Sequence, residues 1–244
     1  MDIVRQFNSP ACATHTMICL PHAGGGTSRY RSWVLELEPY TDVLIPVLPG
    51  RENRFLEPAH MSVSNSVDEI LAALKGKLNK PVYICGISYG ALIAYELALA
   101  LEEQNVAIEG LYIASQRSPC FESELRHWHG MSDLDLINNL QELGGVDTEA
   151  MDPEFLSLFM GTIRTDLQAS DDYLAVKRPK LSCPIQVLWG TQDPVIERRH
   201  IERWHGKSEA PVHLNKIDSG HFLMKNDVDL WLQFIKNDIA AKTP

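Results

Sequence analysis

A serine set between two glycines is the clearest chemical feature of this sequence. The stretch ICGISYGALIAYE places Ser88 in a Gly-x-Ser-x-Gly pattern, between an apolar run and an apolar helical segment. In a nucleophile elbow, the serine occupies a strained turn from strand to helix, and small neighbours are needed because the two backbones approach closely. The pattern therefore predicts that Ser88 is a nucleophile rather than the N-cap serine of a helix.

A serine nucleophile needs a base that takes its proton and a carboxylate that orients this base. With an elbow of this type the chain order is serine, acid, histidine, and the last two lie in loops after later strands. Asp193 in WGTQDP and His221 in DSGHF satisfy this order. Asp218 and Asp227 are rival acids, but the first is expected to shape the turn before His221 and the second to begin a helix. We therefore predict a triad of Ser88, Asp193 and His221.

Backbone amides are expected to complete this site. Attack on an acyl carbon leaves negative charge on its oxygen, which preorganised N–H groups stabilise. One donor should be the residue after the nucleophile, Tyr89, and the other should come from the loop after an early strand. The stretch PHAGGG at 21–26 forms such a loop, and we assign the second donor to Ala23. A plain flexible turn is the alternative for the glycines, and His22 is expected to support the loop.

Elements that could position these residues alternate along the chain. Short apolar runs and amphipathic segments follow one another, which predicts an α/β protein with a parallel sheet covered by helices on both faces. Ser66 and Glu69 have the spacing of a capping box, so a helix is expected to begin there, with an apolar face from Val67 to Leu78. The expected strands are Thr16–Leu20, Val43–Leu48, Pro81–Cys85, Gly110–Ala114, Ile185–Trp189 and a weaker His213–Ile217.

The alternation stops between Arg117 and Pro179. This stretch has helical patterns at Asp133–Leu143 and Pro153–Leu167 but no strand pattern. An excursion of this length between two strands is best explained as a helical insertion over one edge of the sheet. Residues 1–244 as a whole are expected to form a single domain, since α/β folds often reach this size.

Composition excludes several classes of function. The net charge is −10, from 22 basic and 32 acidic residues, which argues against a nucleic-acid binder or a binder of anionic membranes. The five cysteines are scattered and odd in number, as expected for free thiols in a reducing compartment. The N-terminus has no signal-peptide pattern, and no apolar run is long enough to span a bilayer. A cytoplasmic protein is therefore expected.

Several motifs, in order along nearly the whole chain, resemble the type II thioesterases. These are stand-alone α/β-hydrolases that accompany nonribosomal peptide and polyketide synthases. The motifs are LPHAGGGTSRYRSW, LPGRENRF, GISYGALIAYELA, RTDLQASDDY, CPIQVLWGTQDP and GHF. The resemblance implies an α/β-hydrolase fold, with a mostly parallel central sheet, helices on both faces and a helical lid at about 117–179. It also implies that Ser88, Asp193 and His221 are the triad.

The resemblance further implies a serine thioesterase that edits peptide or polyketide synthesis. Its substrate would be an acyl thioester on the phosphopantetheine arm of an acyl- or peptidyl-carrier protein, with an acyl-serine intermediate and no metal or organic cofactor. A medium-chain acyl carrier thioesterase of fatty acid synthesis, a carboxylesterase, an acyltransferase and a non-catalytic carrier-binding module are the alternatives.

Two features qualify the resemblance. Ile87 and Tyr89 replace a His and a Met that many members carry beside the nucleophile, and the bulk of Tyr89 is expected to reshape the acyl entrance. Arg51 and Arg54 in the PGRENRF box are expected to pair with carboxylates, and engagement of the partner protein is the alternative.

Overall fold

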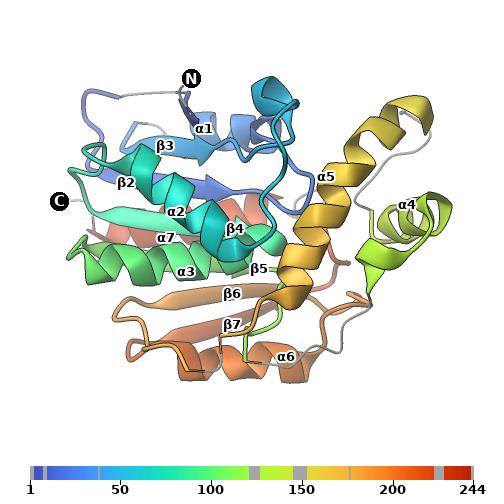
Figure 1. The fold of residues 1–244 in the computed structure, drawn as a ribbon. Helices are drawn as coiled ribbons and strands as arrows, with labels where there is room; N and C mark the ends of the chain where they lie inside the picture. Colours follow the sequence, from blue (N-terminus) through green and yellow to red (C-terminus); the bar gives the residue numbers. More distant parts are fainter. Residues whose placement is uncertain are drawn as a thin grey trace.

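The computed structural model of the protein describes residues 3–7, 10–37, 39–120, 127–144, 153–175, 177–222 and 228–242. Within these residues, one sheet has the strand order β1-β3-β2-β4-β5-β6-β7 (Figure 1). Its pairings are parallel, apart from the antiparallel pair of β1 and β3. The strands are β1 Val4–Gln6, β2 His15–Leu20, β3 Thr41–Pro46, β4 Val82–Ile87, β5 Ile108–Ala114, β6 Ile185–Gly190 and β7 Val212–Ile217.

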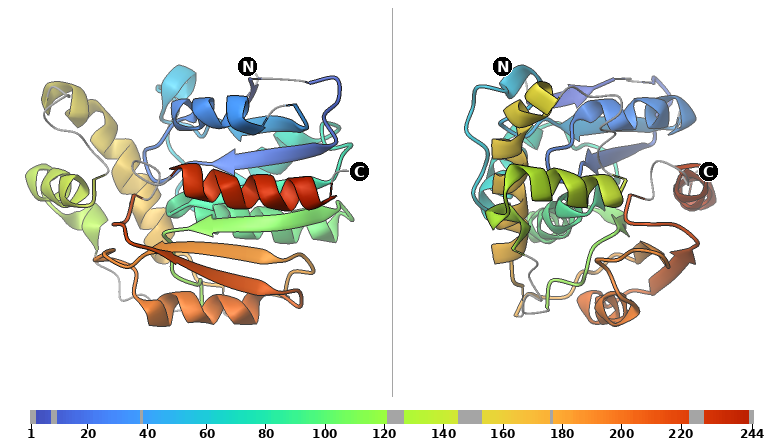
Figure 2. Two further views of the ribbon diagram at one scale, coloured as in Figure 1. Left: turned by 180° about the vertical axis from the view of Figure 1, so that it is seen from behind. Right: turned by 90° about the vertical axis from the view of Figure 1, so that its right-hand side faces the viewer.

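Helices cover both faces of this sheet. Helices α1 and α7 pack on one face, whereas α2 and α3 pack on the other (Figure 2). The α-helices are α1 Arg31–Leu37, α2 Val63–Leu74, α3 Tyr89–Glu103, α4 Asp133–Glu142, α5 Pro153–Asp172, α6 Arg198–Glu202 and α7 Val228–Lys242. The 3-10 helices are η1 Thr27–Tyr30, η2 Glu52–Arg54, η3 Trp128–Gly130 and η4 Arg203–Lys207. None of the helices in the described ranges combines the length and the apolar composition that a membrane span requires.

The central strands are buried on both sides. Every residue of β2, β3 and β4 is buried, as expected for parallel strands between two helical layers. Successive side chains of a strand point to opposite faces. In β2, Met17 accordingly packs with the α1 and α7 side, whereas Ile18 packs with the α2 and α3 side.

Two local expectations were wrong or incomplete. Helix α2 begins at Val63 rather than at Ser66, because Ser62 is the N-cap and its Oγ accepts the Asn65 N–H at 3.1 Å. Ser66 is already helical, and its Oγ lies 3.3 Å from the Tyr89 hydroxyl. The edge strand β1 was not predicted, since three residues are too few to show an alternating pattern.

The described helices between β5 and β6 lie at the edge where the parallel strands end. They are η3, α4 and the long helix α5, which crosses this edge (Figure 1). These helices therefore stand beside the loops that carry the predicted site residues.

Candidate active site

Ser88 lies on a strained turn between β4 and α3. Its backbone angles are φ 51° and ψ −120°, a conformation that is costly for a residue with a side chain. A Cβ atom added at Gly86 would lie 2.2 Å from the Gly90 carbonyl oxygen, so the strand and the helix touch through their backbones. The local geometry is that of a nucleophile elbow, with the serine forced outward at the tip.

The predicted base and acid lie in line with this serine. His221 Nε2 is 3.4 Å from Ser88 Oγ, and His221 Nδ1 is 2.8 Å from Asp193 Oδ2. Both His221 and Asp193 are buried. The other carboxylate oxygen, Asp193 Oδ1, accepts the backbone N–H groups of Val195 at 2.7 Å and Ile196 at 3.1 Å. These bonds fix the carboxylate so that one oxygen faces the imidazole.

The loops after β6 and β7 are held together by backbone contact. A Cβ at Gly190, the last residue of β6, would lie 2.2 Å from the Ser219 carbonyl oxygen and 2.4 Å from that of Gly220. The Gln192 N–H also donates to the Ser219 carbonyl at 3.0 Å. From the neighbouring strand end, Ser115 Oγ donates to the His221 carbonyl at 2.5 Å. The loop carrying His221 is therefore fixed from two sides.

The rival acid Asp218 lies between the loops that follow β6 and β7. Asp218 Oδ1 accepts the Gln192 side-chain amide at 2.9 Å and the Thr191 hydroxyl at 3.3 Å, so it joins the two loops on their exposed side. Asp227 lies outside the described residues. Asp193 is thus the acid that the structure brings to His221.

The predicted amide donors belong to two segments in close contact. Tyr89 is the first residue of α3, so its N–H has no carbonyl acceptor within the helix. A Cβ at Gly90 would lie 2.3 Å from the Leu20 carbonyl oxygen, which shows how closely α3 meets the end of β2. Ala23 lies three residues beyond this contact, in the loop that follows β2.

The Tyr89 side chain does not reshape the acyl entrance, contrary to expectation. It is 1% exposed, packs in the core cluster on the α2 and α3 side, and directs its hydroxyl to Ser66. It is also absent from the lining of the cavity beside Ser88.

His22 has the supporting place expected of it. Its ring packs edge-on against Phe222, with ring centres 5.0 Å apart, and lies against the Gly25 backbone. Burial, together with the charges of Arg29, His221 and Arg51, lowers the pKa of His22 to about 3. At neutral pH this histidine is therefore uncharged.

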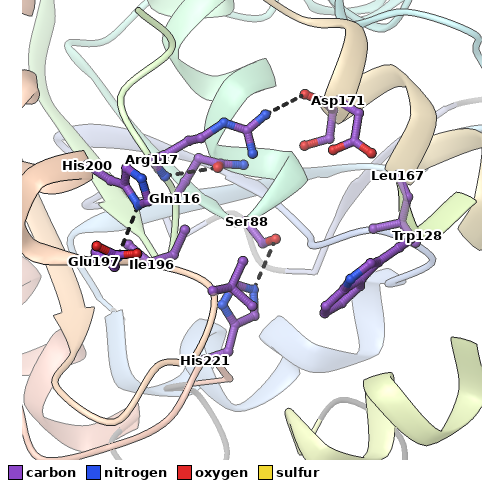
Figure 3. A pocket seen from close by; sticks show the side chains of 12 residues that line it. Ser88, Gln116, Arg117, Trp128, Leu167, Asp171, Ile196, Glu197, His200 and His221 are labelled. Atoms are coloured by element: carbon purple, nitrogen blue, oxygen red, sulfur yellow. Dashed lines mark hydrogen bonds between the residues drawn. The ribbon is translucent and has the colours of Figure 1, made fainter. Parts of the chain in front are cut away.

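A cavity of about 120 Å³ opens beside the nucleophile. Figure 3 shows Ser88 and His221 between Trp128 and Leu167 on one side and a polar group around Gln116 on the other. Trp128 belongs to η3 and Leu167 to α5, so the helices between β5 and β6 form part of its wall. The lining residues are Ser88, Gln116, Arg117, Trp128, Leu167, Ser170, Asp171, Val195, Ile196, Glu197, His200 and His221.

The two arginines of the PGRENRF box are buried and paired with carboxylates, as expected. Arg51 Nη2 lies 2.9 Å from Asp166 Oδ2, and Arg54 Nη2 lies 2.6 Å from Glu69 Oε1 and 2.5 Å from Glu57 Oε2. Sequence reasoning did not single out Asp166 as a partner, although it lies in the RTDLQASDDY motif. Asp166 could have been found from this motif, which places a carboxylate in a segment with a helical pattern between two expected strands.

In the described part of the chain, no cluster of three or more His, Cys, Asp or Glu side chains could hold a metal ion.

Comparison with known proteins gives a consistent result. A family model described as a thioesterase domain matches residues 15–238. Thioesterase PikA5 of Streptomyces venezuelae is 32% identical, covering 97% of this chain and 84% of that protein. The probable anguibactin biosynthesis thioesterase AngT of Vibrio anguillarum is 30% identical, covering 92% and 91% of the two chains.

Solved structures agree. The type II thioesterase BorB from the borrelidin biosynthetic cluster is similar with a TM-score of 0.90 and 29% identity, over 96% of both chains. The RedJ thioesterase from the prodiginine pathway of Streptomyces coelicolor gives a TM-score of 0.87 at 26% identity, over 94% of this chain and 87% of that one. These likenesses and the observed sheet confirm the predicted α/β-hydrolase fold.

Proposed function

This chain belongs to the thioesterase family, and on that premise we propose that it releases acyl groups from the phosphopantetheine arm of carrier proteins by hydrolysing their thioester bond. The resemblance to type II thioesterases noted in the sequence is confirmed by these relatives. One further structural relative, YbtT, is a type II thioesterase from the yersiniabactin NRPS/PKS pathway, with 25% identity. Editing of wrong or stalled acyl units is therefore the proposed role, and the fatty-acid alternative is not favoured.

The single observation that carries the mechanism is the line of three side chains from Ser88 to Asp193. His221 stands between them, 3.4 Å from the hydroxyl and 2.8 Å from the carboxylate. Because Asp193 accepts the proton on Nδ1, the unprotonated Nε2 faces Ser88 and can act as a base. The distance of 3.4 Å from Nε2 to Ser88 Oγ is within hydrogen-bond range, and contacts of this kind tighten in the transition-state complex.

In the acylation half-reaction, Ser88 Oγ attacks the thioester carbon while His221 Nε2 takes the hydroxyl proton. The negative charge that forms on the acyl oxygen is stabilised by the N–H groups of Ala23 and Tyr89. The C–S bond then breaks, and His221 gives its proton to the departing pantetheine thiolate. The acyl group is left as an ester of Ser88.

Water completes the reaction by the same route. His221 removes a proton from a water molecule, and the resulting hydroxide attacks the ester carbon to form a second tetrahedral intermediate. The bond from this carbon to Ser88 Oγ breaks, and the proton returns from His221 to the serine. The free acid leaves, and the starting state of the enzyme is restored without a cofactor.

The size of the cavity favours short acyl groups. A cavity of about 120 Å³ is somewhat smaller than an apolar cavity of about 150 Å³, which is large enough to bind benzene. Trp128, Leu167 and Val195 provide an apolar wall for a short hydrocarbon chain, whereas Gln116 and Ser170 provide polar contacts. We therefore propose a preference for acyl chains of a few carbon atoms.

The region at about 117–179 is proposed as a lid on a single-domain hydrolase. Its helices contribute Trp128, Leu167 and Asp171 to the cavity wall, which shields the acyl-serine from bulk water. A phosphopantetheine arm is long, so parts of this region must shift to admit it.

The proposal is tested with a carrier protein loaded with an acetyl, butyryl or octanoyl thioester. Wild-type protein should remove the short groups faster, and Ser88→Ala should abolish release, as read by mass spectrometry of the intact carrier. Ser64→Ala, at an exposed serine of α2, serves as the matched control and should hydrolyse normally. Unchanged turnover by Ser88→Ala would eliminate the assignment of the nucleophile.

A second assay distinguishes the thioesterase from a carboxylesterase. The kcat/KM for an acyl-pantetheine thioester should exceed that for the oxyester with the same acyl group. Equal or higher values for the oxyester would count against a thioester substrate.

A further inference from the structure

A buried ion pair lies beside the glycine-rich loop. Arg51 Nη2 is 3.0 Å from Asp166 Oδ1 and 2.9 Å from Asp166 Oδ2. The two side chains are only 3% and 1% exposed. Arg51 comes from the PGRENRF box and Asp166 from α5, and neither lines the cavity beside Ser88. The pair therefore has a place outside the substrate pocket.

The pair binds backbone groups of Gly24 and Gly25, the two residues that follow Ala23. The Gly24 N–H donates to Asp166 Oδ2 at 2.8 Å, and Arg51 Nη1 donates to the Gly25 carbonyl at 3.3 Å. The Gly25 N–H closes the loop on the His22 carbonyl at 2.9 Å. The backbone on the C-terminal side of Ala23 is thus held by two charged side chains.

The glycines allow this close approach. A Cβ at Gly24 would lie 2.5 Å from Ile163 Cγ1, one at Gly26 would lie 2.5 Å from Glu52 Oε1, and Gly24 has a φ of +69°. The loop backbone therefore lies directly on α5 and on the segment that contains Arg51. A flexible turn exposed to solvent would show none of these contacts.

Stability alone is a weak explanation for such a pair. Two charges that are buried lose their hydration, and their mutual attraction only partly offsets this cost. Replacing both residues by apolar ones is therefore often neutral or favourable for the stability of the fold. Burial accordingly raises the pKa of Asp166, while Arg51 and the Gly24 N–H oppose this rise. What apolar side chains could not provide is a hydrogen bond to the Gly24 amide and another to the Gly25 carbonyl.

We propose that Asp166 and Arg51 are positioning residues for the oxyanion hole: by fixing the Gly24 and Gly25 peptide groups, they hold the Ala23 N–H toward the acyl oxygen. The inference rests on the proposed function, because the hole matters only if Ser88 attacks an acyl carbon. It also assigns two roles to α5, which walls the cavity through Leu167 and holds the oxyanion loop through Asp166.

Four variants test the proposal: Asp166→Asn, Asp166→Leu, the double variant Arg51→Met/Asp166→Leu, and Thr162→Val as matched control. Thr162 lies one turn earlier on α5, and its Oγ1 donates to the Gly50 carbonyl at 2.9 Å, so the control removes a bond from α5 without releasing the glycine loop. The substrate is an acetyl-pantetheine thioester, and the inhibitor is a methylboronic acid that forms a tetrahedral adduct with Ser88.

Asp166→Leu and the double variant should lose kcat by at least about tenfold, since removal of a complete oxyanion donor costs about 10²–10³ in kcat. KM should change little, because the interaction is made mainly in the transition state. The boronic acid should bind more weakly by a similar factor, while the pH profile of kcat/KM keeps its shape. Asp166→Asn, which keeps one acceptor oxygen, should lie between these variants and wild type.

The double variant decides between positioning and mere stability. It removes both charges and should melt near the wild-type temperature. If the pair only stabilised the fold, this variant would therefore have wild-type activity. A folded double variant with wild-type kcat and wild-type boronate affinity overturns the proposal, as does an equal loss in Thr162→Val. If Asp166→Leu alone does not fold, the double variant still gives the answer. Failure of wild-type protein to hydrolyse any thioester would refute the proposed function instead.

Discussion

Gly190→Ala should disable the site without touching a catalytic side chain. Gly190 ends β6, three residues before Asp193, and its backbone lies against the carbonyl oxygens of Ser219 and Gly220. An alanine Cβ would lie 2.2 Å from the first of these oxygens and 2.4 Å from the second. Both obstacles are main-chain atoms, so rotation of a side chain cannot relieve the overlap.

The size of the effect follows from these distances. Real Cβ contacts essentially never fall below 3.0 Å, so the loop containing His221 must move by about 0.8 Å, the difference between 3.0 and 2.2 Å. This loop sets both the 2.8 Å contact of His221 with Asp193 and its 3.4 Å contact with Ser88. Because misplacement by about 1 Å can cost 10²-fold in rate, we expect kcat to fall between about tenfold and a hundredfold.

The assay compares kcat for thioester hydrolysis with that of Gly220→Ala. Gly220 lies in the same loop, next to His221, but a Cβ there would meet nothing within 4 Å. Gly220→Ala should therefore remain close to wild type. Melting temperatures of both variants show whether the protein is folded. Wild-type kcat in a folded Gly190→Ala variant, or an equal loss in Gly220→Ala, would refute the reasoning.

Three other predictions concern the acid, His22 and the start of α2. Asp193→Asn keeps an oxygen that can accept the Val195 and Ile196 amides. It should nevertheless lower kcat, measured at neutral pH, by about 10³–10⁴, because the imidazole loses the carboxylate that sets its tautomer. The pKa of His22 is 6.5 in the unfolded chain and about 3 in the folded protein, so the unfolded chain binds a proton more readily. The free energy of unfolding should therefore fall as the pH drops from 6.5 toward 3, by up to about 1.4 kcal/mol per pH unit. His22→Gln should reduce that acid sensitivity in urea unfolding at pH 7 and pH 4.5, and an unchanged pH dependence would contradict the assignment. Ser62→Ala should lower the free energy of unfolding by about 1 kcal/mol, because α2 loses its N-cap. A urea titration measures this change, and an unchanged free energy of unfolding would count against Ser62 as the cap.

Much of the fold followed from patterns within single segments. The buried runs that became β2 to β6 are continuous and apolar, and parallel strands need this composition because both faces are covered. The convergence of Ser88, Asp193 and His221 was expected from the chain order that accompanies a nucleophile elbow, and the sheet explains it, because loops at the carboxyl ends of parallel strands share one edge. Local pattern was enough for the strands, whereas the triad also needed this chain order.

Other features depend on tertiary contacts that no local pattern contains. Ser62 and Ser66 are both plausible caps, and Ser62 serves because the chain is still extended there, with φ −152°. The Tyr89 side chain turns into the core toward Ser66, which its position beside the nucleophile did not reveal. Arg51 was expected to pair with a carboxylate, but its partner Asp166 lies 115 residues away. A single sequence gives the type of such a partner without its position.

The glycines show how backbone contact connects these distant parts. Gly90 brings α3 against the end of β2, and Gly190 brings the acid loop against the histidine loop. Gly24 brings the loop at 21–26 against the Ile163 side chain of α5. At each contact, a side chain would separate two segments that carry different parts of the site, by distances that catalysis does not tolerate. Substitution at these three positions should therefore impair turnover, although by less than loss of Ser88, even though none of the three has a side chain that could take part in the chemistry.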